Sequence, residues 1–112
     1  MSEFLFLYRG GEKAESPALM QQQMQRWINW LAQLRESGHV KDAGQPLDGS
    51  GKVVTGKKKV VTDGPYAEKD LVGGYTLIEA KDLSHATELS LGCPIFEYGG
   101  LVEVRPVMKM SM

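Results

Sequence analysis

Cysteine is nearly absent from this 112-residue sequence, and the absence narrows its chemistry. The only one is Cys93, so an internal disulfide is excluded and no Cys-x-x-Cys pair is available to a metal. The two histidines, His39 and His85, are far apart in the sequence and lack the spacing of a metal-ligand set. We therefore expect no metal site and no cofactor.

An excess of basic charge is also missing. Thirteen Lys and Arg residues stand against 14 Asp and Glu residues, which gives a net charge of −1 and a sequence pI of about 6.1. Nucleic acids and anionic membranes attract proteins with a basic field, so we expect neither as a partner. The basic run at residues 57–59 is typical of a solvated hairpin tip.

Long apolar runs are lacking at the N-terminus, where residues 4–8 form a run of only five. It is too short for a membrane span or a signal peptide, so we expect a cytoplasmic protein. Both faces of this segment are apolar: Phe4, Phe6 and Tyr8 alternate with Leu5 and Leu7. The pattern predicts a strand that is covered on both sides.

The first helix is predicted from Pro17 to about Ser37. Ser16 is a typical N-cap residue, proline is favoured at the first helical position, and Gly38 is a typical helix terminator. Apolar residues at helical spacing predict the buried stripe. They are Met20, Met24, Trp27, Ile28, Leu31 and Leu34.

Further elements are predicted downstream. Residues 53–55 and 60–62 flank a Gly-Lys-Lys-Lys turn and indicate a β-hairpin, and residues 74–80 indicate a strand. A second helix is predicted at about residues 83–91, with Asp82 or Ser84 as its cap. The last strand is predicted at residues 101–108, with Val102, Val104 and Met108 on one face, and Pro106 favours an edge position.

The order of these elements predicts one α+β domain over residues 1–112. It is that of a ferredoxin-like split βαβ fold, here βαβ-hairpin-βαβ, with an antiparallel sheet. Each helix has one apolar stripe, so both are expected on the same sheet face. The other face would expose apolar residues of the first strand, together with either Leu101 and Val107 or Tyr75 and Leu77, and this predicts a homodimer through that open face.

Two charged residues share the open face near the C-terminus. Glu103 and Arg105 are two positions apart on one predicted strand and therefore point the same way. They have two interpretations: a salt bridge at the sheet rim, or a cleft wall in which Arg105 holds an anionic group.

The mid-chain stretch Asp63-Gly64-Pro65-Tyr66 has the composition of a turn. Gly64 and Pro65 are predicted to shape it. Asp63 either accepts backbone N–H bonds within the turn or faces a substrate. Tyr66 can offer its hydroxyl to a cleft. Glu68 either forms an exposed pair with Lys69 or, if buried, acts as a general base.

These motifs together resemble the YCII-related proteins, and most closely the branch named for an Asp-Gly-Pro-Phe motif. The resemblance is carried by Asp63-Gly64-Pro65-Tyr66-Ala67-Glu68, by Cys93-Pro94 and by Glu103-Val104-Arg105-Pro106. It implies a dimeric α+β barrel with a cleft in each protomer near the Asp motif. Some members are thought to be small-molecule enzymes that use a helix His and an Asp.

The sequence departs from that His–Asp pair. Trp27 stands at the helix position expected for the His, and Cys93-Pro94 replaces an Asp-Pro. One hypothesis is a cofactor-independent small-molecule enzyme with Asp63, Arg105 and Glu68 as catalytic candidates. The alternative is a non-catalytic dimeric ligand-binding or accessory module. The candidates for ligand binding are Tyr66, Glu103, His39 and Trp27.

Overall fold

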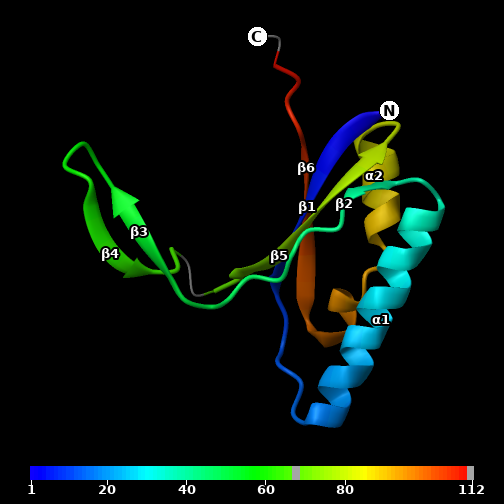
Figure 1. Ribbon diagram of the computed structural model, residues 1–112, viewed down its shortest axis with the longest axis horizontal. Coiled ribbons are helices and arrows are strands. Elements are labelled where there is room, and N and C mark those ends of the chain that lie inside the picture. The colour runs from blue at the N-terminus through cyan, green and yellow to red at the C-terminus, as the bar shows by residue number, and fades with distance from the viewer. Residues whose placement is uncertain (67–68, 111–112) are drawn as a thin grey trace.

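The structure is a computed structural model that describes residues 1–66 and 69–110. Its elements run in the order predicted from the sequence, with a short 3₁₀ helix, η1, added after the second helix (Figure 1). They are β1 (Ser2–Gly10), α1 (Pro17–Glu36), β2 (Val40–Asp42), β3 (Gly51–Thr55), β4 (Val60–Gly64), β5 (Val72–Ala80), α2 (Leu83–Ser90), η1 (Pro94–Tyr98) and β6 (Gly100–Pro106).

The main sheet has four strands in the order β2-β5-β1-β6, and every neighbouring pair is antiparallel. This strand order, with a helix after β1 and another after β5, is the ferredoxin-like arrangement. The predicted α+β fold is therefore confirmed. Pro106 lies on β6, an edge strand, as its missing N–H group predicted.

The core lies between the sheet and the two helices. On β1, Phe4, Phe6 and Tyr8 are buried toward the helices, whereas Leu5 and Leu7 face the other way and are half-buried. Thr76 and Ile78 of β5 join the buried side, opposite Phe6 and Phe4. The sheet therefore has one covered face and one open face.

The helix caps agree with the sequence. The Ser16 hydroxyl accepts a hydrogen bond from the Leu19 N–H at 3.1 Å, and Gly38 ends the helix with a φ of +79°, which favours glycine. The open choice at the second helix is settled. Asp82 is the N-cap, and its carboxylate accepts from the His85 N–H at 2.8 Å.

The predicted stripe of α1 was partly wrong. Trp30 and Leu34 are the buried residues of this helix, and the Trp30 ring stacks on Phe6 with centroids 6.2 Å apart. Ile28 is 54% exposed, because the helix turns its Trp30 side toward the sheet. Met20 and Met24, in the N-terminal half of the helix, are also exposed.

The predicted extension of the last strand to Met108 was also wrong. β6 ends at Pro106, and Met108 follows it with 81% of its surface exposed. Val102 and Val104, from the same predicted face, do pack against the core. The β1–β6 ladder ends at the pair Phe4–Pro106, and one further backbone bond, from the Val107 N–H to the Glu3 carbonyl at 3.0 Å, follows it before the chain leaves the sheet.

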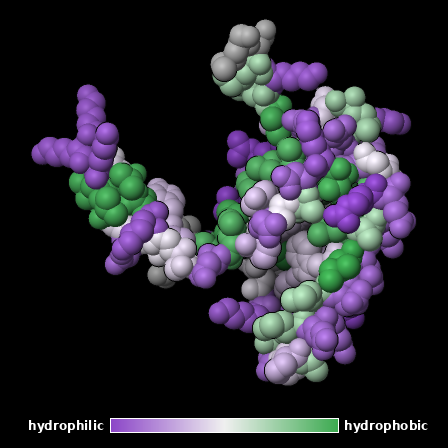
Figure 2. Space-filling model, viewed as in Figure 1, coloured by the Kyte–Doolittle hydropathy of each residue, from purple (hydrophilic) through white to green (hydrophobic). Residues whose placement is uncertain are grey.

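Strands β3 and β4 form a two-stranded sheet of their own (Figure 1). We call residues 51–64 the arm. It projects from the main sheet on the side away from the helices (Figure 1). Its valines are exposed and form an apolar patch beside the hydrophilic tip, which holds the three lysines of residues 57–59 (Figure 2). The hairpin was predicted, but its separation from the sheet was not.

Candidate functional site

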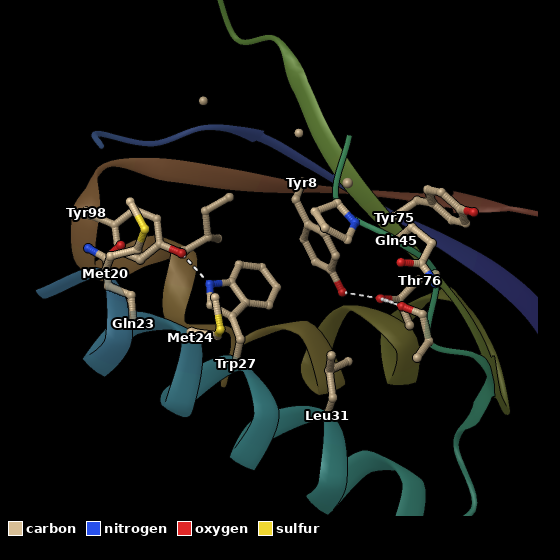
Figure 3. A pocket seen from close by; sticks show the side chains of 17 residues that line it. Tyr8, Met20, Gln23, Met24, Trp27, Leu31, Gln45, Tyr75, Thr76 and Tyr98 are labelled. Atoms are coloured by element: carbon tan, nitrogen blue, oxygen red, sulfur yellow. Dashed lines mark hydrogen bonds between the residues drawn. The ribbon is translucent and has the colours of Figure 1, made fainter. Parts of the chain in front are cut away.

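A half-open cavity of about 440 Å³ lies between the N-terminal half of α1 and the sheet (Figure 3). Its volume is within the range of small-molecule sites. Three segments enclose it: α1, the loop between β2 and β3, and η1. The side chains that shape it are Tyr8, Met20, Gln23, Met24, Trp27, Leu31, Gln45, Thr76, Ile95 and Tyr98.

Aromatic side chains form the inner surface of the cavity. The ring of Tyr8 meets the ring of Trp27 edge to face, with centroids 4.7 Å apart at 79°. The Trp27 indole N–H donates to the hydroxyl oxygen of Tyr98. Because both contacts hold Trp27, its ring has one defined orientation (Figure 3).

A hydrogen-bond chain attaches the β2–β3 loop to the sheet. The Tyr8 hydroxyl donates to Thr76 Oγ1 at 2.7 Å, and Thr76 Oγ1 donates to the Ala43 carbonyl at 2.9 Å. Gly44, with a φ of +74°, lies so close to β5 that a Cβ would stand 1.7 Å from the Tyr75 carbonyl oxygen. This close approach requires glycine and forms one wall of the cavity.

The cavity is electrically neutral at physiological pH. Burial raises the pKa of Tyr8 well above its ordinary value, and burial also raises the pKa of Tyr98. Gln23 and Gln45 are the polar side chains at its margin. Among the described residues that line it, none carries a carboxylate or an imidazole.

Of the described catalytic and ligand-binding candidates from the sequence, Trp27 is the one that lines this cavity. It occupies the position at which the family resemblance implies a histidine. Tyr8, Thr76 and Tyr98 were missed as site residues. The alternating pattern of β1 could have pointed to Tyr8, because it is the last buried residue of that strand. The contact of Tyr98 with Trp27 depends on the tertiary fold.

The motif at residues 63–66 lies elsewhere, at the base of the arm. The Asp63 carboxylate is 89% exposed and pairs with the Lys52 amine at 2.5 Å, directly across the hairpin. The Gly64–Pro65 peptide bond is cis, and Tyr66 is 88% exposed. Glu68 lies outside the described residues.

Glu103 and Arg105 point out of the open face of the sheet and form part of an ion-pair network. Glu103 accepts from Arg9 Nε at 2.8 Å and from Arg105 at 3.3 Å. Arg9, and to a lesser extent Arg105, hold the pKa of Glu103 below its usual range. Asp63 and Arg105, two of the catalytic candidates from the sequence, have different partners on different sheets.

The two histidines lie where α1 leads into β2 and where α2 begins. His39 Nδ1 is 2.9 Å from the Glu79 carbonyl, and His85 Nδ1 accepts from the Lys81 N–H at 3.0 Å. Their rings meet edge to face with centroids 5.1 Å apart. Both therefore stabilise local backbone, and neither lines the cavity.

The described residues contain no cluster of three or more His, Cys, Asp or Glu side chains that could hold a metal ion. Within the same residues, no helix combines the length and hydropathy that a membrane span requires.

These observations define a ferredoxin-like α+β domain with an aromatic cavity on its helix-covered side. The sequence matches the YCII-related domain family over residues 3–111, nearly the whole chain, so the chain belongs to this family. The resemblance drawn from the motifs is thus confirmed, while assignment to the Asp-Gly-Pro-Phe branch stays a prediction. No curated protein matched the sequence.

Proposed function

We propose that this protein binds a small, mainly apolar molecule in the cavity under α1. The observation that carries the proposal is the cavity itself, about 440 Å³ in volume and lined by Tyr8, Trp27, Tyr98 and methionines. Ligand sites are typically concave, largely apolar and supplied with a few fixed polar groups. Methionine side chains adapt to ligands of varied shape.

The polar groups limit the chemistry of the ligand. The Tyr98 oxygen accepts from Trp27, and its own proton has no acceptor in the described part of the chain. A ligand with a carbonyl or ether oxygen near Tyr98 would accept this proton. The lining favours a neutral ligand, because an anion would find no cationic partner among the described lining residues.

Binding without proton transfer is better supported than catalysis in this cavity. General acid–base catalysis needs a group whose pKa lies near the working pH, and tyrosines with raised pKa values do not meet this condition. Catalysis by Asp63, Arg105 and Glu68 stays a prediction. Turnover by the wild type that is abolished in Asp63→Asn at unchanged stability would establish it.

A metabolite library tests the binding proposal. Thermal shift identifies ligands, and Trp27 reports them through its fluorescence. Met24→Arg should abolish binding because it places a charge at the cavity mouth. Ile28→Arg is the matched control, since Ile28 is equally exposed on the same helix and does not line the cavity. Equal binding by both variants would refute the assigned site.

We also propose a homodimer through the open sheet face. Leu5, Leu7 and Leu77 form an apolar strip across its central strands, and Leu101 and Val107 extend it, 40% and 41% exposed. Joining two such faces would remove this strip from water. Light scattering at micromolar concentration should give twice the mass of one chain, and the mass of a monomer would overturn the proposal.

A further inference from the structure

Among the described residues, no other element packs on the arm, because β3 and β4 pair only with each other. Val54, Val60 and Val61 are 60%, 53% and 60% exposed. An isolated two-stranded hairpin is at best marginally stable in water. The radius of gyration is 15.8 Å, against about 13 Å for a compact chain of this length. A partner surface that covers the valines would stabilise the arm.

The register of the arm places apolar groups on both of its faces. Val54 pairs with Val61, and on the opposite face Val53 pairs with Thr62. In the described part of the chain, these strands pair only with each other, and the valines of the arm are exposed on the face seen in Figure 2. Apolar groups on both faces suit an arm that is enclosed by a partner.

The base of the arm leads directly to the open face. A second concave surface of about 480 Å³ lies there, bordered by Arg9, Leu47, Pro65, Tyr66 and Leu71. Arg9 is on the same face of β1 as Leu5 and Leu7. The arm also projects away from the helices (Figure 1), so a second molecule stacked on the open face would lie beside the arm.

Charge favours a second copy of this chain as the partner of the arm. We call the part of the chain outside residues 51–64 the body. Residues 51–64 contain four lysines and one aspartate, a net charge of +3. The whole chain carries −1, so the remaining residues carry −1 − 3 = −4. The arm of one copy and the body of another are therefore of opposite charge.

We propose that the arm of each protomer packs against the body of a second copy, when the two open faces stack. The inference rests on the homodimer proposed above. Two-fold symmetry makes the exchange reciprocal and closed. Tyr66 and the arm valines become part of the interface, and the Lys52–Asp63 pair stabilises the arm where it leaves the body. The motif at residues 63–66 is then an interface element.

Sedimentation equilibrium of the full chain tests the proposal. The Val54→Asp/Val61→Asp variant should raise the dimer dissociation constant at least tenfold, because it places two charges in a desolvated contact. Leu91→Asp is the control, since Leu91 is 69% exposed at the end of α2, and its dissociation constant should equal that of the wild type. Circular dichroism checks that both variants fold.

Two results separate the proposals. A monomeric wild type overturns the dimer and the arm exchange together. A dimeric wild type whose dissociation constant is unchanged in the arm variant overturns the arm exchange alone. A photo-crosslinker on Val61→Cys gives a direct readout, because Cys93, the native cysteine, is buried. Covalent dimers are expected, and their absence from a sample shown to be dimeric also overturns the arm exchange.

Discussion

At the scale of single residues, Thr76 connects the sheet to the wall of the cavity. Its hydroxyl accepts from Tyr8 and donates to the Ala43 carbonyl, and the residue is completely buried. Thr76→Val would leave a buried donor and a buried acceptor without partners. We expect a loss of about 1–3 kcal/mol of unfolding free energy, measured by urea denaturation.

Thr87→Val is the matched control for this measurement. Thr87 is exposed on α2, where its hydroxyl donates to the Leu83 carbonyl. A surface substitution of this kind changes stability by less than about 0.5 kcal/mol. Equal effects of the two substitutions would show that the hydrogen-bond chain contributes nothing beyond the change of side chain.

Glu103 gives a pH-dependent prediction at the same scale. Its folded-state pKa is below the ordinary value of 4.5, so its ionised form is favoured in the folded protein. The stabilisation is present above pH 4.5 and is lost as the pH falls through the lowered pKa. The unfolding temperatures of the wild type and Glu103→Gln should therefore converge as the pH is lowered from 4.5 through the folded-state pKa. A constant difference at all pH values would contradict the assigned ion pair.

At the scale of the element, α1 packs through Trp30 and presents Ile28 to solvent. Trp30→Ala should cost about 3–5 kcal/mol of stability, because the ring fills the space against Phe6. Ile28→Ala should change stability by less than about 0.5 kcal/mol. Chemical denaturation of the two variants measures the difference, and similar losses would indicate a different rotation of the helix.

The helix also shows how far the sequence could be followed. Its ends were predictable, because Ser16, Pro17 and Gly38 act through local backbone geometry. Its buried side was not, because Met20, Met24 and Ile28 have the spacing of a core stripe, yet Met20 and Met24 line the cavity and all three are more than half exposed. The same limit applies to the site: Trp27 was placed among the ligand-binding candidates, but its contact with Tyr98 joins residues 71 positions apart.

At the scale of the whole molecule, the body and the arm are separate packing units. The arm strands pair in their own sheet, and the core residues belong to the body. Gly51 and Gly64 are cross-strand neighbours, so two glycines can replace residues 52–63 without straining the chain. We expect this deletion to retain cooperative unfolding by circular dichroism at high dilution. Loss of cooperativity would show that the arm supports the body.

The sequence by itself determined the order of the elements, the helix caps, the hairpin and the family, because these depend on local propensities and on short motifs. It also predicted an antiparallel sheet with one open face, since the periodicity of each strand assigns its side chains to two faces. Only the tertiary structure decided where the cavity lies and that residues 63–66 lie at the base of the arm. Those features depend on contacts between distant segments, and local patterns do not encode such distances.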